Sequence, residues 1–436
     1  MENKIKDIKA WQILNSSGLP TVRVEVEADS GVKGFANVPN GTSKGKFEAH
    51  ELKDNNQSLF MGQSVQKAVD NVNNIIKKEL VQKDVFNQKG IDNILIELDN
   101  TDNKSKLGAN AVLGVSMAVC ACASNCLNIP LYKYIGGMSA NIMPTPMINI
   151  INGGVHAQNN LDFQEFMITP AGALNFFEAM MISSNVFYSL KNILEKEDKI
   201  TSVGLEGGFA PDLKSNREAI DLIIKAIYEA GYTSDDVKIC LDIASSEFYE
   251  DEKYKLKGEK LELDRKGMCE YLSELTEDYP VISIEDGMAQ DDYTGWRILT
   301  DELKDKCLIV GDDLFTTNPK LLKEGINNNI ANAILIKLNQ IGTITETMET
   351  IEIAKNANYK YIISHRSNET EDAFIADFAV GVNSGLIKTG SVTRSERVAK
   401  YNRLIEIENE LRGKYLGINS YFKNAKNNCK RCNCHG

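Results

Sequence analysis

The sequence lacks the features of a protein that binds nucleic acids or membranes. It has no long basic run, and its 61 acidic residues outnumber its 49 basic residues, giving a formal net charge of -12 at pH 7. Such a chain cannot neutralise successive phosphates along a nucleic acid or an anionic bilayer. It also has no apolar stretch of about 20 residues, the length that spans a membrane. We therefore expect neither a nucleic-acid partner nor a membrane span.

The N-terminus lacks the apolar stretch of a signal peptide, because Glu2, Lys4 and Lys6 place charges there. The body of the chain also lacks cysteines at the spacing of a metal site. The cysteines in that part lie mostly in apolar patterns and are expected to be reduced core residues: Cys120, Cys122, Cys126, Cys240, Cys269 and Cys307. These absences predict a soluble, cytoplasmic protein.

The polar tail, residues 421–436, does contain such a spacing. Cys429, Cys432 and Cys434, followed by His435, form a C-x-x-C-x-C-H pattern. This pattern could hold a soft metal or form a redox pair. The alternative is a solvated tail with reactive thiols and no dedicated role.

Residues 1–137 are expected to form an α+β domain. Three strand-like runs, at 5–13, 21–27 and 32–38, predict a strand meander. The small and basic residues 40–46 include two glycines and predict a mobile loop. The run 109–127 is apolar around most of a helical circumference, which predicts a buried structural helix.

Residues 138–420 are expected to form a second domain, in which short apolar runs alternate with amphipathic helices. This pattern is typical of a parallel β/α architecture. Polar residues close successive runs, and those from Glu285 onward lie 27, 25, 28 and 23 residues apart, about one βα unit each: Asp242, Glu285, Asp312, Lys337, His365 and Lys388. The predicted fold class is therefore α/β, with a TIM-like β/α barrel that carries these side chains at its C-terminal mouth.

Asp242, Glu285 and Asp312 would repel one another and lose hydration if they met without a cation. Ligation by oxygen alone suits Mg²⁺ or Mn²⁺ better than Zn²⁺. The sequence therefore predicts a site for a hard divalent cation. The alternative is that the three carboxylates separately cap the helices that follow their strands.

Lys337 directly follows the apolar run 333–336. Desolvation and nearby metal charge would favour its neutral form, and a neutral lysine can act as a base. The alternative is a strand-end lysine whose ammonium group reaches solvent. Beside the carboxylates, we interpret Lys337 as the base that removes the α-proton of a metal-bound carboxylate, with Lys388 facing the charge that develops.

Two further groups complete the candidate site. Expulsion of a β-hydroxyl needs a proton donor, and Glu206, in a glycine-rich loop, and Glu165 are candidates. Either glutamate could instead be a structural carboxylate. Arg366 and Ser367 follow an apolar run and His365, and an arginine fork beside a hydroxyl suits a phosphate or a carboxylate.

These segments resemble the motifs of the enolase family, in the same order and over about residues 4 to 420. The bacterial branch is the most similar. The motifs include Gln164-Glu165-Phe166-Met167-Ile168, Ser283-Ile284-Glu285-Asp286, Gly311-Asp312-Asp313-Leu314, Ser364-His365-Arg366-Ser367 and Ile387-Lys388-Thr389-Gly390.

The resemblance implies the glycolytic dehydration of 2-phosphoglycerate to phosphoenolpyruvate. Lys337 would be the base, Glu206 the acid supported by Glu165, and Lys388 would stabilise the enolate. A lysine base with magnesium ions is the arrangement known for enolase-superfamily sites. The implied Mg²⁺ ligands are Asp242, Glu285 and Asp312.

The resemblance also implies how the substrate and a second subunit are held. Arg366 and Ser367 would hold the phosphate, His365 would contact the substrate, and His156 would lie on the phosphate and loop side. A homodimer is the smallest assembly implied.

Several positions depart from the enolase pattern. Asn40 replaces the serine expected to bind a second Mg²⁺, so a second metal site would rest on an amide or backbone oxygen. Leu205 replaces the aspartate before the proposed acid. Ser17 replaces the arginine of the first hairpin, and Asn368 replaces the glycine after His-Arg-Ser.

These departures leave two alternatives open. One is a divergent paralogue with weak or no dehydratase activity that serves a binding or regulatory role. The other is an enzyme that removes an α-proton from a different acid, because the carboxylates and Lys337 determine the chemistry more than the substrate.

Overall fold

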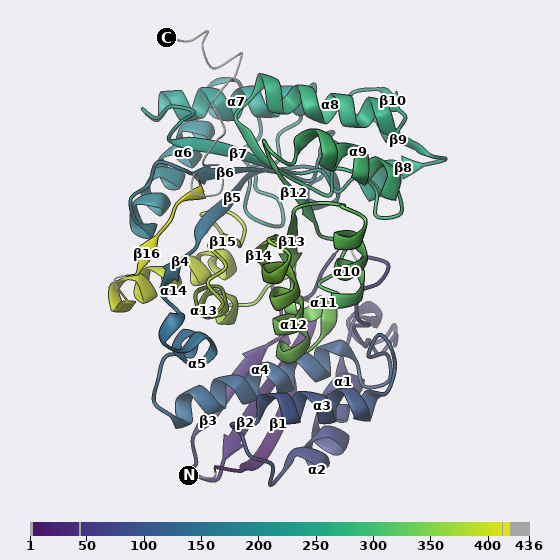
Figure 1. Cartoon of the computed structure of the whole chain (residues 1–436), viewed down its shortest axis with the longest axis vertical. Helices are drawn as coiled ribbons and strands as arrows, with labels where there is room; N and C mark the ends of the chain where they lie inside the picture. Colours follow the sequence, from purple (N-terminus) through teal and green to yellow (C-terminus); the bar gives the residue numbers. More distant parts are fainter. Residues whose placement is uncertain (1–2, 43–44, 412, 419–436) are drawn as a thin grey trace.

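The computed structural model describes residues 3–42, 45–411 and 413–418. The chain forms a small N-terminal layer of strands and helices beside a larger barrel (Figure 1). The cysteine tail lies outside the described residues, as do Ser43 and Lys44 of the predicted mobile loop.

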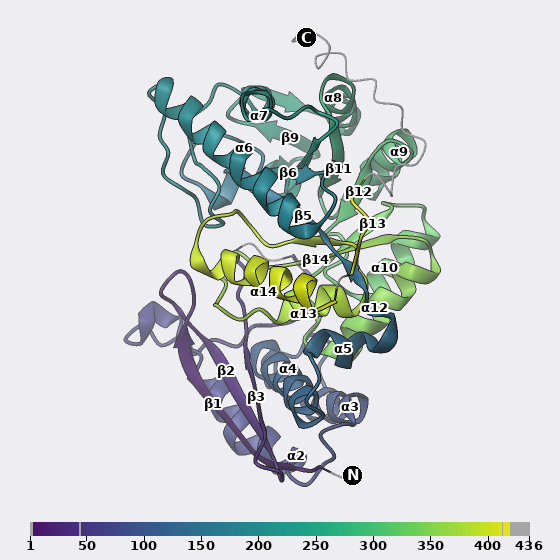
Figure 2. The same cartoon turned by 90° about the vertical axis from the view of Figure 1, so that its left-hand side faces the viewer.

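The N-terminal sheet has three antiparallel strands in the order β1-β2-β3, at Ile5–Leu14, Pro20–Ala28 and Lys33–Asn37. The alternating valines Val22, Val24 and Val26 are fully buried on one face of β2. Helices α1 (Gln66–Asn71), α2 (Lys77–Leu80), α3 (Gln88–Asp99) and α4 (Ala109–Cys126) complete the domain, and the sheet and α4 form separate layers in Figure 2. The predicted meander and buried helix are confirmed.

Helix α4 packs against strands β2 and β3 of the sheet and also contacts the N-terminal helices α1 and α3. Among the described residues it is the one helix long and apolar enough to cross a membrane, but 83% of this 18-residue stretch is buried inside the molecule. Its composition is therefore that of a core helix.

Eight strands form the closed barrel in the order β11-β12-β13-β14-β15-β5-β6-β7. Five of them end at or directly before the predicted polar residues Asp242, Glu285, Asp312, Lys337 and His365: β7 (Val237–Asp242), β11 (Val281–Glu285), β12 (Leu308–Gly311), β13 (Ala333–Ile336) and β14 (Lys360–Ser364). The other three are β5 (Thr145–Asn152), β6 (Glu165–Pro170) and β15 (Leu386–Lys388). The α/β class and the barrel are confirmed.

The barrel helices lie outside the strands (Figure 1). They are α6 (Phe176–Lys196), α7 (Asn216–Glu229), α8 (Arg265–Asp278), α9 (Tyr293–Leu303), α10 (Pro319–Asn327), α12 (Ile344–Asn356), α13 (Phe374–Gly381) and α14 (Ser395–Leu411). Two shorter helices are α5 (Leu131–Gly136), before the barrel, and α11 (Leu338–Ile341), directly after Lys337.

Short strands lie beside the barrel rather than in it. Strands β8 (Tyr249–Glu250), β9 (Lys253–Leu256) and β10 (Leu261–Leu263) form a small antiparallel sheet, and β4 (Ile142–Met143) pairs with β16 (Lys414–Tyr415).

One strand corrects the prediction of a fully parallel barrel. Strand β6 is antiparallel to both β5 and β7. The connection from β5 to β6, residues 153–164, contains only a short 3-10 turn, whereas a parallel neighbour needs a crossover that usually contains a helix. The reversal brings the first residue of β6, Glu165, to the barrel mouth.

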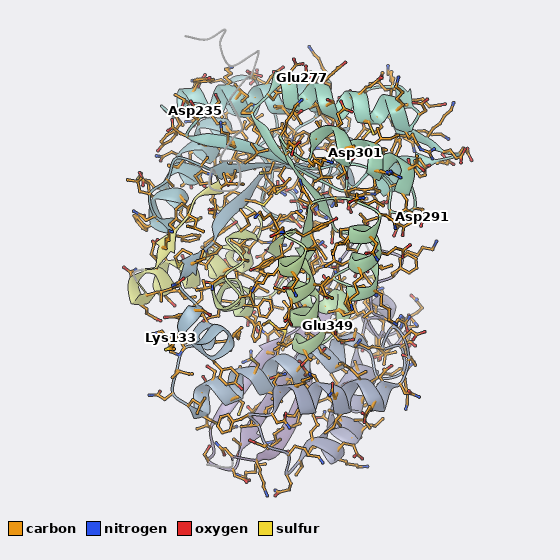
Figure 3. The ribbon with its side chains drawn as sticks, viewed as in Figure 1. Lys133, Asp235, Glu277, Asp291, Asp301 and Glu349 are labelled. Carbon is orange, nitrogen blue, oxygen red and sulfur yellow. The ribbon has the colours of Figure 1, made fainter. Side chains whose placement is uncertain are left out.

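The excess of acidic side chains is spread over the outside of the molecule. Figure 3 labels five exposed carboxylates, Asp235, Glu277, Asp291, Asp301 and Glu349, on separate barrel helices and loops.

Candidate active site

The strand register brings the candidate residues to one end of the barrel. Asp242 pairs in register with Glu285 on one side and with Glu165 on the other. Lys388, the last residue of β15, pairs with Ser364, the last residue of β14. The carboxyl ends of the seven parallel strands and the reversed start of β6 therefore meet at the predicted mouth.

Lys388 is the buried cation around which the carboxylates gather. Its Nζ lies 2.9 Å from an Asp242 oxygen, 2.8 Å from a Glu285 oxygen and 3.2 Å from a Glu165 oxygen. Burial alone would lower the pKa of Lys388, but Asp242, Glu165 and Glu285 together raise it well above its ordinary value. Lys388 is therefore an ammonium ion in this arrangement.

Lys337 is held beside Asp312 at the next strand ends. Its Nζ lies 2.5 Å from an Asp312 oxygen, and its backbone N–H donates to Thr317 Oγ1 at 2.9 Å. Gln340 donates to the other Asp312 oxygen at 2.9 Å and accepts from Thr317 at 2.7 Å. This network, which sequence reasoning missed, fixes the positions of Asp312 and Lys337.

Lys337 is protonated, whereas the sequence predicted a neutral lysine. Burial does act to lower the pKa of Lys337, but the charge of Asp312 outweighs it and the pKa is raised. The reason is the direct ion pair, which a strand-end pattern does not reveal. With protein groups alone, Lys337 is charged.

The three predicted metal ligands are of the donor type that suits a hard divalent cation, but each is paired with a lysine: Asp242 and Glu285 with Lys388, and Asp312 with Lys337. Asp242, Glu285 and Asp312 are each at most 8% exposed and offer only carboxylate oxygens. Burial, followed by the charge of Asp242, raises the pKa of Glu285 well above its usual range. A carboxylate that burial and like charge make costly to ionise is favoured by a nearby cation.

A second acidic group supports the end of β12. Oxygens of Asp286, Asp312 and Asp313 lie within 4.8 Å of one another. Asp286 accepts the backbone N–H groups of Asp312 at 2.9 Å and Asp313 at 2.8 Å. Asp286 thus orients the strand end that carries Asp312.

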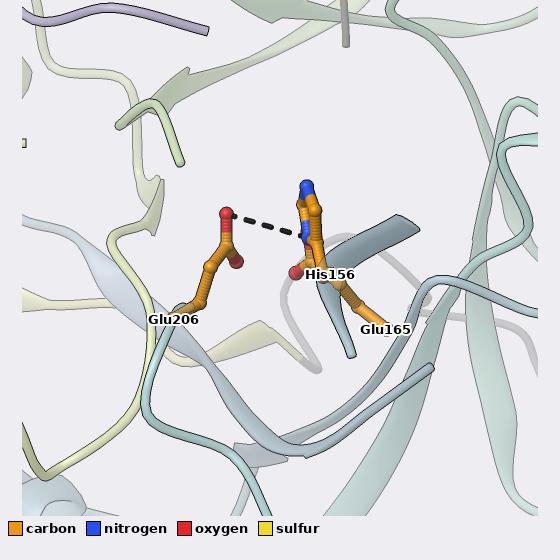
Figure 4. Close-up of side chains that lie close together, drawn as sticks. All are labelled: His156, Glu165 and Glu206. Carbon is orange, nitrogen blue, oxygen red and sulfur yellow. Dashed lines mark ion pairs between the residues drawn. The ribbon is translucent and has the colours of Figure 1, made fainter. Parts of the chain in front are cut away.

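His156, Glu165 and Glu206 meet at the side of the mouth shown in Figure 4. His156 ends a 3-10 turn, Gly154–His156, and Glu206 lies in the loop before α7. The Nδ1 atom of His156 lies 3.6 Å from Glu165 and 3.7 Å from Glu206. Neither ring nitrogen of His156 has a hydrogen-bond partner among the described residues, although the ring is buried. A buried, unsatisfied imidazole is suited to a polar ligand.

The two glutamates have opposite protonation preferences. Burial and the charge of Glu206 raise the pKa of Glu165 well above its usual range. Burial also disfavours ionised Glu206, but His365 and His156 outweigh it and hold its pKa well below its usual range. A proton on this pair is therefore favoured on Glu165 over Glu206.

The predicted anion-binding residues contact the N-terminal domain. Arg366 pairs with Glu48 through two bonds of 2.9 and 3.2 Å and also donates to Asn339 at 3.0 Å. The hydroxyl of Ser367 accepts the backbone N–H of Thr42 at 2.8 Å. Sequence reasoning missed Glu48, because its loop carries no local pattern typical of a site.

Arg397 on α14 is a further residue that sequence reasoning missed. This fully buried arginine donates to the carbonyl oxygens of Arg366 at 2.6 Å and Ser367 at 2.5 Å, and lies 2.5 Å from His365 Nδ1. It also donates to the carbonyl of Leu205 at 3.3 Å. Arg397 thus joins the acid loop to the anion-binding segment, yet in sequence it looks like any arginine of an amphipathic helix.

One cavity of about 20 Å³ lies at the centre of these groups. Its lining consists of His156, Gln164, Glu165, Glu206, Asp242, Lys337, Ser364, His365, Arg366, Ser367 and Lys388. Glu285 and Asp312 contact this lining through Lys388 and Lys337. The structure therefore brings together the predicted site residues other than Asn40.

Asn40 lies apart from the cavity. Its side-chain oxygen accepts from Asn15 at 3.1 Å, and its side-chain nitrogen donates to Glu51. Its backbone carbonyl accepts the N–H of Asn368 at 3.0 Å. Both oxygens that could bind a second Mg²⁺ thus accept hydrogen bonds from the protein, and a metal role for Asn40 stays a prediction.

Comparison with known families agrees with this architecture. Residues 5–135 match the enolase N-terminal domain, and residues 140–424 match the enolase C-terminal TIM barrel domain. Members of this family are lyases that act on small molecules and typically use Mg²⁺. The chain is therefore a member of the enolase family.

Proposed function

We propose that this protein dehydrates 2-phosphoglycerate to phosphoenolpyruvate in the cytoplasm, with Mg²⁺ as its cofactor. The observation that carries the proposal is the meeting of Lys337, a candidate base, and the Glu165–Glu206 pair, a candidate acid, at one buried cavity. The carboxylates of Asp242, Glu285 and Asp312 would hold Mg²⁺ beside them. When bound, Mg²⁺ supplies positive charge that offsets negative charge developing on the substrate carboxylate.

Lys337 takes the α-proton of the substrate in this proposal. Because Lys337 is charged while it is paired with Asp312, that ion pair must weaken and the ammonium group must release its proton to water before the amine can accept the α-proton. Lys388 keeps its own charge and faces the carboxylate side of the enolate. Lys337 and Lys388 therefore have different roles, set by different partners.

The Glu165–Glu206 pair supplies the proton that the departing hydroxyl needs. A proton on this pair is favoured on Glu165, while Glu206 faces His365 at 3.3 Å and His156 at 3.7 Å. We assign Glu206 as the group that delivers the proton and Glu165 as the group that stores it. His156, within 4 Å of both, is placed to assist the exchange.

Substrate binding requires this arrangement to open. A cavity of about 20 Å³ holds one water molecule and not a phosphorylated three-carbon acid. We propose that Arg366 and Ser367 exchange their contacts with Glu48 and Thr42 for the phosphate, with His365 and His156 completing the pocket.

Two further assignments belong to this proposal. A second Mg²⁺ would bind through Asn40 only after its amide oxygen releases Asn15. We also propose a homodimer, supported by exposed apolar side chains on the N-terminal sheet: Trp11 is 38%, Leu14 57% and Phe35 40% exposed. Light scattering of the purified protein measures its mass directly.

The alternatives are a paralogue with weak or no dehydratase activity and an enzyme acting on another acid. The engaged oxygens of Asn40 and the pairing of Arg366 with Glu48 favour the first, because both must change before substrate can bind. Leu205 also leaves the acid loop without a second carboxylate.

The test is phosphoenolpyruvate formation from 2-phosphoglycerate at varied Mg²⁺, followed by ultraviolet absorbance. We expect turnover that depends on Mg²⁺ and disappears in Lys337→Ala. No turnover above that variant, in folded protein, would exclude the proposal. A strong rate increase in Leu205→Asp or Asn40→Ser would show that these departures weaken an inherited activity.

A further inference from the structure

We infer that Asn368 is a positioning residue that ties the loop at residues 40–42 and the turn at residues 15–17 to the anion-binding segment. This inference rests on the proposed function, because it concerns how Ser367 is presented to a phosphate. Asn368 itself directly follows Ser367 and is 9% exposed.

The backbone of Asn368 pairs with the loop. Its N–H donates to the carbonyl of Asn40 at 3.0 Å, and its carbonyl accepts the N–H of Asn40 at 2.9 Å. These reciprocal bonds form a one-residue antiparallel bridge between the barrel and the N-terminal domain. Asn368 is thereby placed with its side chain beside both segments.

The side-chain amide of Asn368 forms hydrogen bonds through both its nitrogen and its oxygen. Its nitrogen donates to Thr42 Oγ1 at 3.1 Å, and its oxygen accepts from the hydroxyl of Ser17. The turn is joined to the barrel a second time by Ser16, whose backbone N–H donates to the carbonyl of Glu369 at 2.8 Å. A side chain with only a donor or only an acceptor could not make both contacts.

Thr42 is the point at which this network reaches the proposed phosphate site. Its Oγ1 accepts hydrogen bonds from both Ser367 at 2.9 Å and Asn368 at 3.1 Å. If Ser367 turns its hydroxyl proton toward a phosphate, Thr42 loses one of these donors. Asn368 then keeps the loop in place while Ser367 binds the ligand.

The network contains three of the positions at which this chain departs from the enolase pattern: Ser17, Asn40 and Asn368. Each of them contacts the next, from Ser17 to Asn368 and from Asn368 to Asn40. The replaced side chains of Ser17 and Asn368 thus bond to each other, whereas Asn40 contacts Asn368 through backbone atoms.

The first readout is amide hydrogen exchange in the full-length protein, which needs no turnover. In Asn368→Ala we expect the Thr42 amide to exchange roughly five-fold faster, the effect of losing one neutral hydrogen bond. Asn185→Ala, which removes an exposed amide that donates to Tyr232 on the outer helix layer, is the matched control and should leave Thr42 unchanged. Equal exchange in Asn368→Ala and the wild type would overturn the inference.

The second readout is the separation of KM from kcat for 2-phosphoglycerate. We expect Asn368→Ala to raise KM about five-fold and to change kcat less than two-fold, because Asn368 holds the loop and does not touch the reacting atoms. Thr42→Val, at an exposed position that does not threaten folding, should give the same effect, and the double variant should add little to it. Fully additive effects, or a loss confined to kcat, would contradict the inference.

The two readouts separate this inference from the proposed function. If the wild type does not turn over 2-phosphoglycerate, the proposed function fails while the exchange of Thr42 still tests Asn368. If turnover is present and the Thr42 amide is insensitive to Asn368→Ala, only the positioning role fails.

Discussion

Lys388 shows how strongly the site depends on single charges at the residue scale. Its ammonium group is the shared partner of Asp242, Glu285 and Glu165, all of them buried. Removing one partner of a buried ion pair leaves the remaining charge without compensation, which costs about 3–5 kcal/mol. The metal-free protein should therefore rely on Lys388 for stability.

We predict that Lys388→Met lowers the free energy of unfolding by about 3–5 kcal/mol in the presence of a chelator, measured by urea denaturation at neutral pH. Mg²⁺ should restore part of this loss, because it would bind the same carboxylates in the native state only. Lys225→Met is the control, since Lys225 pairs with Glu197 at the surface and its loss should have no measurable effect. Equal stability of the two variants would contradict this role of Lys388.

His365 gives the site a defined dependence on pH. Burial lowers its pKa to about 4, although the charge of Glu206 acts in the opposite direction. In the unfolded chain a histidine titrates near 6.5. Below that pH the unfolded state gains a proton that the native state does not, so the free energy of unfolding falls as pH decreases from about 6.5 toward 4.

We predict that His365→Gln loses less stability than the wild type over this pH range, with an upper limit of about 3 kcal/mol on the difference. Urea denaturation at several pH values between 7.5 and 4.5 measures both proteins. Parallel pH curves would show that His365 does not titrate as its environment indicates.

The sequence predicted the residues that close strands, because a polar side chain that directly follows an apolar run is expected at the C-terminal mouth of a β/α barrel. Asp242, Lys337 and Lys388 are of this kind. It did not predict Glu48 or Arg397, because their roles depend on contacts between segments far apart in the chain. The charged state of Lys337 was missed for another reason: the strand-end pattern placed Asp312 at the same mouth but did not reveal its direct ion pair with Lys337.

At the element scale, the two layers of the N-terminal domain approach each other at a glycine. A Cβ added at Gly34 of β3 would lie 2.1 Å from the backbone nitrogen of Cys122 in α4 and 2.5 Å from the carbonyl of Ala118. These neighbours are backbone atoms, so neither can move aside without shifting the helix. The valines of β2 reach α4 only because this approach is close.

We therefore predict that Gly34→Ala lowers the free energy of unfolding by at least about 1–3 kcal/mol, as overpacking of a core does. Gly267→Ala in the first turn of α8 is the control. Its Cβ would meet atoms no closer than 3.4 Å, and alanine favours a helix. Urea denaturation measures the free energy of unfolding of both variants. If Gly34→Ala leaves it unchanged, the two layers are less tightly packed than described.

The direction of strand β6 could not be predicted from the sequence. Alternation of apolar runs and helices predicts parallel strands, but the direction of one strand depends on what connects it to its neighbour. The β5–β6 connection is long enough in residues to be mistaken for a crossover and contains only a 3-10 turn.

At the scale of the whole molecule, the two domains are joined by buried polar contacts. Arg366 pairs with Glu48 at 2.9 Å, and Lys104 pairs with Glu346 at 2.9 Å. Asp92 of α3 accepts from the hydroxyl of Thr345 in α12 at 2.6 Å. Separation of the domains would expose these groups or leave them without hydrogen-bond or ion-pair partners. Unfolding of one domain alone is therefore unfavourable.

We predict that the metal-free protein unfolds in a single cooperative transition, with a calorimetric enthalpy equal to the van't Hoff enthalpy. Lys104→Met should weaken the coupling and broaden the transition. Two resolved transitions in the wild type would show that the contacts between the domains do not couple them.

The central claim is that Lys337 removes the α-proton while the Glu165–Glu206 pair delivers the proton to the hydroxyl. The most direct test is exchange of the C2 hydrogen of 2-phosphoglycerate with deuterium from the solvent, followed by NMR in the presence of Mg²⁺. The account predicts exchange in the wild type, continued exchange without phosphoenolpyruvate formation in Glu206→Gln, and no exchange in Lys337→Ala. Exchange that survives in Lys337→Ala, or phosphoenolpyruvate formation that survives in Glu206→Gln, would contradict the account.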